Sequence, residues 1–297
     1  MDRQDAVSGA RCGGPLRRDI LLGAGAATLL AVSRVRADET PLQFGLTPVF
    51  LSDDIELLRR LEAYLSRATG RSVRLVTRRT YQEITTLLVS GRLDAAWICG
   101  YPFVSFQDRL KLLAVPVWRG DTVYQSYLIV RNGREASGLD DLEGDVHAFS
   151  DPDSNSGYLV TRALLARRGI GPDTFFDRTI FTYGHRNVVR AVASGLVQSG
   201  SVDGYVLEVL KEVEPDLATA VTVVRASEWL GFPPVAAPRV PALEARTALI
   251  QEALLKMASD PEGQAVLHAL RLDGFEQRPP GIFDPIAEKV ALVRSLG

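Results

Sequence analysis

The sequence predicts an α/β protein of two similar lobes, joined by two chain crossings and preceded by a leader segment. Short apolar strands alternate with amphipathic helices, and the two halves of this alternation repeat each other at a constant offset. Two further stretches have the pattern of segments that connect one lobe to the other. The composition is that of a globular protein, with 46% hydrophobic and 24% charged residues. A net charge of −2 without long charged runs argues against nucleic-acid binding.

Residues 1–37 have the pattern of an export signal. Arg17 and Arg18 precede an apolar stretch, Ile20–Val32, and Val35-Arg36-Ala37 follows as a small-residue cleavage site. We expect cleavage after Ala37. The arginine pair resembles a twin-arginine signal; an ordinary Sec signal and a retained membrane anchor are the alternatives. Beyond this segment no apolar run reaches spanning length, so we expect the mature form not to span a membrane.

The first half of the mature chain predicts strands and helices in turn. Apolar residues at Ile55, Leu58, Leu61 and Leu65 have helical spacing, and the helix ends before Gly70. The strands expected here are Leu42–Leu46, Val73–Val76 and Ala95–Ile98, and the helices are Asp53–Ala68 and Tyr81–Ser90.

The second half repeats the first at an offset of 104 residues. Tyr81 corresponds to His185, each at a helix start, and Cys99-Gly100 corresponds to Asp203-Gly204. This register favours two similar lobes. The strands expected in the second half are Val146–Phe149, Thr179–Phe181 and Ser201–Val206, and the helices are Tyr158–Arg167 and Arg186–Ser194.

Two segments suit the crossings between lobes. Asp121–Val130 is long, alternating and β-rich, and Glu228–Ala237 would carry the chain back before a helix over Leu243–Met257. The lobes are therefore expected to comprise residues 38–128 with 229–297, and residues 129–228. A hinge with two crossings closes around a ligand.

The repeat places loops from both lobes around one cleft, because the carboxyl ends of the strands face each other there. To these loops we add Tyr124 of the first crossing. The ligand-binding residues expected are Phe50, Tyr81, Cys99, Gly100, Tyr101, Tyr124, Ser154, Asn155, Ser156, His185 and Asp203.

The run Asp151–Tyr158 lies between a strand and a helix and carries hydroxyl and amide groups at Ser154, Asn155 and Ser156. Hydroxyls and free N–H groups at a helix start form an anion site; simple capping of the helix is the alternative. His185 is either a donor to a ligand oxygen or a cap. Asp203 either accepts from a protonated ligand oxygen or bonds its own turn.

These residues resemble a known family. Asp-Pro-Asp-Ser-Asn-Ser-Gly-Tyr-Leu from Asp151, then Gly184-His185 and Ala191–Gly195, are similar to the phosphate-, phosphite- and phosphonate-type (PhnD-like) periplasmic binding proteins of ABC importers. The resemblance implies a type II periplasmic binding protein fold, periplasmic location and an ABC permease as partner. It also implies an oxyanion ligand held by the helix-start hydroxyls with help from His185 and Asp203.

Three positions depart from that family's pattern. Gln198 stands where an acidic residue is common, Phe50 replaces a polar aromatic residue, and Cys99 ends a buried strand at the cleft. Cys99 is the single cysteine of the expected mature chain. A related branch comprises arsenite-sensing periplasmic proteins that act with a membrane histidine kinase, and trivalent arsenic seeks thiolates. Arsenite sensing through Cys99 is therefore the alternative to oxyanion uptake.

An enzyme is not expected. Cys99, His185 and Asp203 have the residue types of a nucleophile, a base and an orienting group, but the repeat puts Cys99 and His185 on opposite lobes and no signature motif surrounds the thiol. We expect no cofactor, and no metal-ligand spacing is present, apart from Cys99 as an arsenic ligand in the alternative.

Overall fold

The computed structural model describes residues 40–48 and 55–295. The expected export signal, its cleavage site and Phe50 lie outside the described residues. No helix within the described ranges is both long and apolar enough to cross a membrane.

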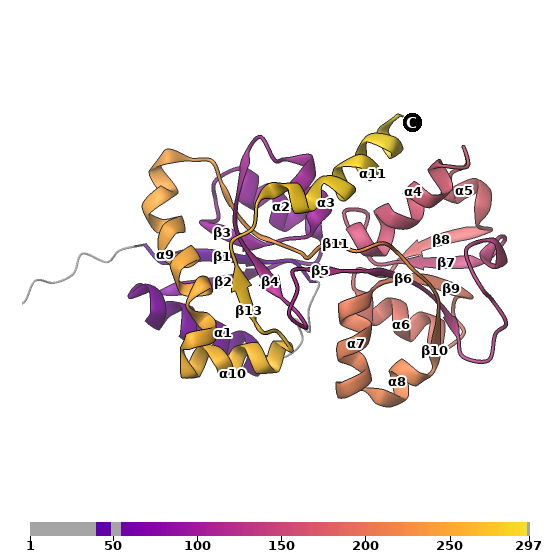
Figure 1. Cartoon of the computed structure of the whole chain (residues 1–297), viewed down its shortest axis with the longest axis horizontal. Helices are drawn as coiled ribbons and strands as arrows, with labels where there is room; N and C mark the ends of the chain where they lie inside the picture. Colours follow the sequence, from indigo (N-terminus) through magenta and orange to yellow (C-terminus); the bar gives the residue numbers. More distant parts are fainter. Residues whose placement is uncertain (1–39, 49–54, 296–297) are drawn as a thin grey trace, which may run out of the picture. The chain divides into compact units, whose positions relative to one another are not determined.

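The first lobe is built on a six-stranded sheet (Figure 1). Its strands are β1 (Leu42–Leu46), β2 (Val73–Thr77), β3 (Ala95–Trp97), β4 (Leu110–Val117), β12 (Val235–Pro238) and β13 (Gly274–Glu276). They lie in the order β13-β4-β12-β3-β1-β2, with β1 parallel to β2 and β3 and the remaining pairs antiparallel.

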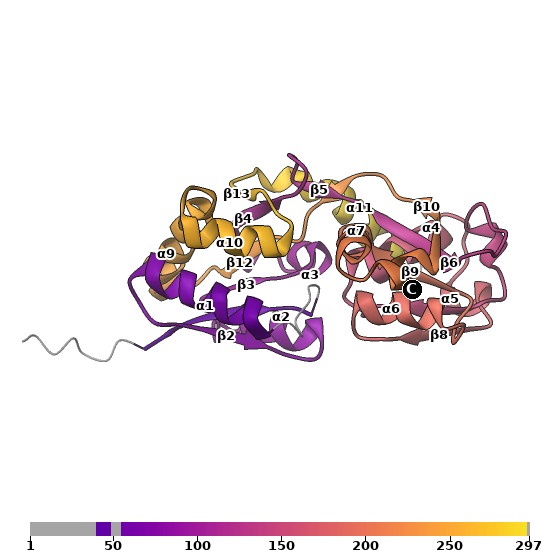
Figure 2. The ribbon, with the colours of Figure 1, turned by 90° about the horizontal axis from the view of Figure 1, so that it is seen from below.

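Helices surround this sheet. They are α1 (Ile55–Thr69), α2 (Tyr81–Val89), α3 (Gly100–Ser105), α9 (Glu244–Leu255), α10 (Pro261–Leu270) and α11 (Asp284–Arg294). Helix α1 packs against α9 and α10, and these three lie side by side in both views (Figure 2). Leu57, Leu61 and Leu65 of α1 are buried, as the helical spacing of its apolar residues predicts.

The second lobe has a five-stranded sheet in the order β10-β6-β9-β7-β8. Its strands are β6 (Ser126–Arg131), β7 (Val146–Phe149), β8 (Arg178–Phe181), β9 (Ser199–Asp203) and β10 (Val221–Ala226), and its helices are α4 (Val160–Ala166), α5 (Pro172–Phe175), α6 (His185–Ala193), α7 (Gly204–Val213) and α8 (Pro215–Thr219). A π-helical turn, Asn155–Leu159, precedes α4. Phe149, Phe175 and Phe176 belong to a second apolar core in this lobe.

The two lobes repeat the same arrangement, which confirms the predicted α/β fold with two similar lobes. The order β3-β1-β2 in the first sheet corresponds to β9-β7-β8 in the second. Helices α2 and α6 begin at Tyr81 and His185, and each ends in a turn at a left-handed glycine, Gly91 (φ 73°) and Gly195 (φ 76°). Glycine adopts this conformation without the steric cost that other residues incur.

The two crossings pair with each other. Strand β5 (Val123–Tyr124) of the first crossing is antiparallel to β11 (Leu230–Gly231) of the return. The expected continuous strand over 121–130 is interrupted at Gln125, whose carbonyl oxygen accepts a hydrogen bond from the Gly204 N–H at 2.9 Å.

The prediction of a strand over Ser201–Val206 is wrong in its second half. Strand β9 ends at Asp203, and α7 begins at Gly204. Asp203 occupies the N-cap position, and its carboxylate accepts from the Val206 N–H at 3.3 Å. The capping carboxylate satisfies a backbone N–H that has no partner within the helix. This interaction favours the helix over the strand that valine and tyrosine side chains prefer.

The C-terminal helix α11 packs against α3 of the first lobe and α4 of the second. Lys289 on this helix is only 4% exposed, and its ammonium group pairs with Glu228 of the return crossing. Helix α11 therefore links both lobes beside the hinge. The lobe boundaries 38–128, 129–228 and 229–297 remain a proposal.

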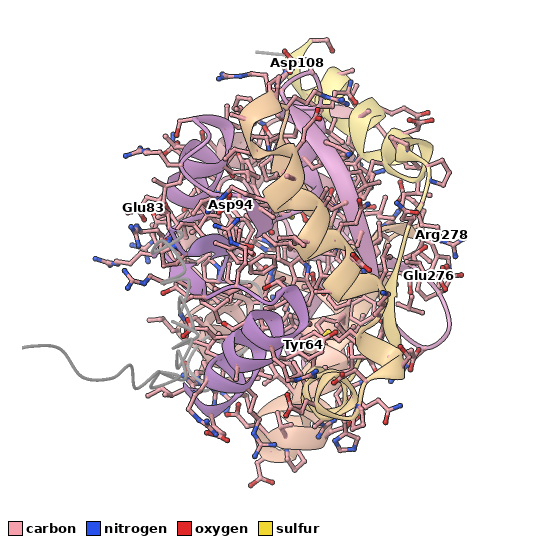
Figure 3. The ribbon with its side chains drawn as sticks, turned by 90° about the vertical axis from the view of Figure 1, so that its left-hand side faces the viewer. Tyr64, Glu83, Asp94, Asp108, Glu276 and Arg278 are labelled. Atoms are coloured by element: carbon pink, nitrogen blue, oxygen red, sulfur yellow. The ribbon has the colours of Figure 1, made fainter. Side chains whose placement is uncertain are left out.

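An ion pair between Arg246 of α9 and the buried Asp94, which Figure 3 labels, ties α9 to the first sheet. Asp94, 2% exposed in its side chain, precedes β3 and accepts from both Arg246 Nε and Arg246 Nη2, the latter at 2.8 Å. Its carboxylate also accepts from the Gln43 N–H of β1 at 2.6 Å. Asp94 therefore joins a helix and two strands.

We expect Arg246→Met to lower the free energy of unfolding by about 3 kcal/mol, because it leaves a buried carboxylate without its counter-ion. Urea unfolding of the variant and the wild type measures this change. The matched control is Arg59→Met on α1, since Arg59 pairs with Glu56 in an exposed position and such pairs contribute little. Equal stability losses in the two variants would contradict the role given to Asp94.

Candidate ligand-binding site

A buried polar cluster joins the two lobes. Each of its side chains is 2% exposed or less. We call this group the inner cluster; its members are Tyr81, Cys99, Tyr124, Asp151, Ser154, Asn155, Ser156, His185 and Asp203. The sequence analysis predicted all of them as ligand contacts except Asp151.

The second lobe contributes the loop after β7 and the π-helical turn. The Ser154 hydroxyl accepts from the Gly157 N–H at 3.0 Å, so it caps this turn. Asn155 Nδ2 donates to the Tyr124 hydroxyl at 2.8 Å, and Ser156 Oγ donates to Asp203 at 3.3 Å. π-Helical turns are rare in proteins, and those that occur are often at functional sites.

Gly157 lets this turn approach β7 closely. A Cβ atom at position 157 would lie 1.9 Å from Ser150 Oγ, a distance that no substituted residue tolerates. The glycine of the Ser-Asn-Ser-Gly run is therefore required by packing, and it holds the three preceding residues at the end of the strand.

The first lobe contributes two helix starts. Thr80 and Glu83 form a capping box that fixes the beginning of α2, with Thr80 Oγ1 accepting from the Glu83 N–H at 3.3 Å. Tyr81 is the first residue of this helix. Cys99 occupies the N-cap position of α3, two residues after the end of β3.

Hydrogen bonds cross between the lobes within the cluster. The Tyr81 N–H donates to Asp151 at 3.2 Å, and the Asn155 N–H donates to Cys99 Sγ at 3.1 Å. The Tyr81 hydroxyl lies 3.3 Å from His185 Nε2, so the two residues paired by the sequence repeat contact each other. Because these side chains are almost fully buried, a ligand reaches them only when the lobes separate.

The hydrogen bonds of His185 fix its tautomer. Its Nδ1 accepts from the Asp203 N–H at 3.1 Å, which leaves the proton of the neutral ring on Nε2. Burial lowers the pKa of His185 to about 3, so the ring is neutral at pH 7. Nε2–H therefore donates to the Tyr81 hydroxyl, whose own proton remains available to another acceptor.

Burial also favours the neutral form of the acidic groups. It raises the pKa of Asp203 to about 7 and that of the Cys99 thiol to about 12, and it raises the pKa of Asp151 above its usual range. Lys289 is the one lysine or arginine that is buried in the part of the chain described. Arg186, the cation next to His185, pairs with Glu214 at 2.5 Å. The inner cluster thus presents mostly neutral donors.

Two polar atoms at the cluster have no hydrogen-bond partner in the described part of the chain: Asn155 Oδ1 and Ser150 Oγ. An unsatisfied buried polar atom costs about 1–3 kcal/mol, so native proteins satisfy nearly all of them. A ligand with both acceptor oxygens and a hydroxyl would satisfy the Asn155 oxygen and the donors around it.

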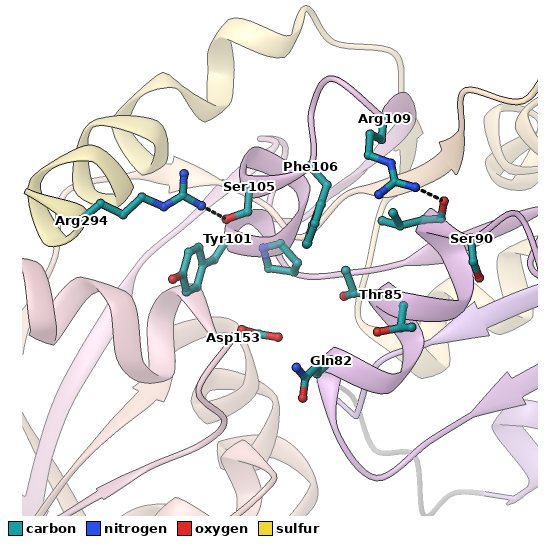
Figure 4. Close-up of a pocket in the computed structure, with 12 residues that line it drawn as sticks. Gln82, Thr85, Ser90, Tyr101, Ser105, Phe106, Arg109, Asp153 and Arg294 are labelled. Carbon is teal, nitrogen blue, oxygen red and sulfur yellow. Dashed lines mark hydrogen bonds between the residues drawn. The ribbon is translucent and has the colours of Figure 1, made fainter. Parts of the chain in front are cut away.

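Two predicted site residues lie elsewhere. Gly100 is buried against α11, where an added Cβ would lie 2.6 Å from Ile286 Cδ1. Tyr101 is half-buried and lines a separate cavity of about 490 Å³ (Figure 4), which we call the outer chamber. Conversely, Asp151 was not predicted as a ligand contact; its position two residues after the end of β7 is the signal that marks it.

No group of three or more His, Cys, Asp or Glu side chains in residues 40–48 and 55–295 has an arrangement suited to a metal ion. Cys99 is a free, buried thiol. Its partner in the structure is the Asn155 N–H.

Comparisons with known proteins agree with this architecture. Residues 44–278 match the family described as "ABC transporter, phosphonate, periplasmic substrate-binding protein". Three solved structures share the fold. The first is a binding protein component of an ABC phosphonate transporter from Pseudomonas aeruginosa, with 21% identity over 86% of this chain and 87% of that one and a TM-score of 0.78.

The second is PhnD1 from Prochlorococcus marinus in complex with methylphosphonate (17% identity, 85% of this chain and 98% of that one, TM-score 0.75). The third is a Xanthomonas citri protein bound to chloride ion (19% identity, 86% and 98%, TM-score 0.69). At these identities the structures establish the type II periplasmic binding protein fold predicted from the sequence.

The protonation of Asp203 predicts a pH-dependent stability difference between wild type and Asp203→Asn. Unfolding returns the carboxyl pKa from about 7 to about 3.8, so the unfolded state loses its proton first and the contribution of Asp203 to wild-type stability falls as pH rises from 4 to 7. The asparagine does not titrate. The unfolding free energy of the variant relative to wild type should therefore rise over this range by at most about 4 kcal/mol, and then level off.

Urea unfolding at unit pH intervals from 4 to 8 measures this difference. Asparagine also caps helices well, so the start of α7 is preserved. A difference that stays constant with pH would show that Asp203 is ionised throughout and would contradict the assignment.

Proposed function

The chain belongs to the family of periplasmic substrate-binding proteins of phosphonate ABC transporters, and from this premise we propose that it delivers a small tetrahedral oxyanion to a membrane importer. The proposed ligand is of the phosphonate, phosphite or phosphate type. Members of this family bind and deliver substrates, so the chain is a binding protein and not an enzyme. The expected twin-arginine export signal over residues 1–37 is part of the same proposal.

The observation that carries the proposal is the run Ser154–Ser156 at a helix start, buried in one cluster with Tyr81 and His185. Hydroxyl and backbone donors at a helix N-terminus are suited to oxygen anions. The phenolic proton of Tyr81, freed by the donation from His185, adds a further donor.

The protonation of the cluster favours a ligand that keeps one proton. A fully ionised tetrahedral anion beside Asp151 and Asp203 would meet like charge, whereas a monoanion has one hydroxyl to donate. Asn155 Oδ1 is an acceptor without a partner in the described residues, and Asp203 with its pKa near 7 exchanges a proton readily. A phosphonate or phosphite monoanion fits this set of donors and acceptors.

We expect Ser154→Ala and Ser156→Ala each to weaken binding of phosphite or methylphosphonate by about 1–3 kcal/mol, because each removes a hydrogen bond to a charged group. Calorimetry at pH 7 measures the affinities. Ser259→Ala, which alters an exposed serine, is the matched control and should bind as wild type. Unchanged affinity in both loop variants, for a ligand that binds the wild type, would remove this loop from the site.

A second candidate function rests on the position of Cys99. Its sulfur lies inside the inner cluster and accepts from the Asn155 N–H of the opposite lobe. Arsenite at neutral pH is a neutral hydroxide that forms an S–As bond and releases one hydroxyl with the thiol proton as water. A cluster rich in neutral donors is compatible with such a ligand, and an arsenite sensor would act with a membrane histidine kinase.

Cys99→Ser separates the two candidates. In uptake of an oxyanion the thiol is not a bonding group, so phosphite affinity should stay within about threefold of the wild-type value. In arsenite sensing no hydroxyl replaces the thiolate, so arsenite binding should vanish. Calorimetry with both ions on the two proteins, with circular dichroism as the folding control, measures this. Arsenite binding that survives in Cys99→Ser rules out the sensor mechanism.

A further inference from the structure

The outer chamber is a second compartment at the cleft, and the inner cluster does not include its lining. It has a volume of about 490 Å³ and is lined by α2, by α3 and the residues after it, by Asp153 of the second lobe and by Arg294 of α11 (Figure 4). A cavity of this size holds an organic group and not merely a few water molecules.

The chamber adjoins the inner cluster along the chain on both lobes. Gln82 follows Tyr81, and Asp153 precedes Ser154. Adjacent Cα atoms are about 3.8 Å apart, so lining residues of the chamber and members of the inner cluster are direct chain neighbours on both lobes.

The chamber wall contains a buried polar atom without a partner. Thr85 is 3% exposed, and its Oγ1 has no hydrogen-bond partner within the described part of the chain. Gln82, Ser90 and Ser105 add further polar groups to the lining. This wall is therefore suited to a substituent with hydrogen-bonding groups and not to a plain alkyl chain.

Two guanidinium groups lie at the rim of the chamber (Figure 4). Arg109 donates to the Val89 carbonyl at 3.3 Å, and Arg294 donates to Ser105 Oγ at 3.4 Å. Both hydrogen bonds are long and have neutral acceptors, so the arginines are available to stronger acceptors. The acidic residue of the lining is Asp153, whose pKa is raised by burial and by Asp151.

We propose that the outer chamber receives the substituent of the oxyanion ligand and that this substituent ends in a second anionic group bound by one of the two rim guanidinium groups, that of Arg109 or that of Arg294. The inference rests on the proposed function, since it places the oxyanion head in the inner cluster. It narrows the ligand class to organophosphonates, or related oxyanions, with an acidic tail. Arginine favours carboxylate and phosphate groups because its planar donors match their oxygens.

The test compares phosphonates that differ only in the tail. Calorimetry at pH 7 measures wild-type binding of methylphosphonate, propylphosphonate, 3-phosphonopropionate and 4-phosphonobutyrate. We expect one of the two carboxylate-bearing probes to bind about tenfold more tightly than propylphosphonate. Either Arg109→Gln or Arg294→Gln should remove most of this advantage, and that variant should weaken the acidic probe far more than propylphosphonate.

Matched controls separate tail recognition from a general effect of charge. Arg178→Gln removes an exposed arginine of β8 that does not line the chamber. It should change neither the affinity for propylphosphonate nor that for the carboxylate-bearing probes. Thermal melting confirms that each variant is folded.

Three results would overturn the inference. They are equal affinity for propylphosphonate and both acidic probes, equal losses for all probes in the arginine variants, and tighter binding of 3-aminopropylphosphonate than of the acidic probes. The last result would instead indicate that Asp153 binds a cationic group at the end of the substituent. If methylphosphonate and propylphosphonate bind and the acidic tail adds nothing, the chamber inference fails alone; if no phosphonate binds, the proposed function fails as well.

Discussion

Each lobe buries polar groups whose hydrogen-bond partners lie on the opposite lobe. Tyr81 donates its N–H to Asp151, Asn155 donates to Cys99, and His185 donates to Tyr81. In each case the donor and the acceptor come from opposite lobes, so separation of the lobes breaks all three bonds. Because burial makes the cost of an unpaired group high, the lobes must exchange these bonds for bonds to water or to a ligand whenever they part. A ligand that replaces these bonds in the closed form therefore shifts the equilibrium between open and closed lobes, and the free energy of closure contributes to the measured affinity.

The internal repeat explains how one sequence builds this pairing. Tyr81 and His185 are equivalent residues at equivalent helix starts, and they meet at the cleft. Cys99 and Asp203 are likewise equivalent N-cap residues. The strand order around them is the same in both sheets. The point at which the strand order reverses, where α/β proteins bind ligands, therefore recurs in each lobe. The second lobe contributes hydroxyl and amide groups to the inner cluster, and the first lobe contributes aromatic groups and sulfur.

Much of this architecture could be predicted from sequence because it rests on local signals. Strands β1 and β7 agree with the prediction residue for residue, and helix α2 differs only at its last residue. The errors occur where a capping or tertiary contact overrides propensity, as at Asp203 and Gln125. The inner cluster was predictable from the repeat, but Asp151 was not assigned a role because its partner, the Tyr81 N–H, is seventy residues away. The outer chamber was not predictable at all, since Thr85, Arg109 and Arg294 share no pattern and meet only in three dimensions.

Helix α11 restrains movement at the hinge because it packs against both lobes. It lies against α3 and α4, one from each lobe, and the buried Lys289 anchors it to the half-exposed carboxylate of Glu228 in the return crossing. Two crossing strands alone would allow a wide range of opening angles, but a helix packed against both lobes must lose its contacts with one of them as the lobes separate. The contacts of α11 therefore add to the free energy that opening costs and favour the closed arrangement.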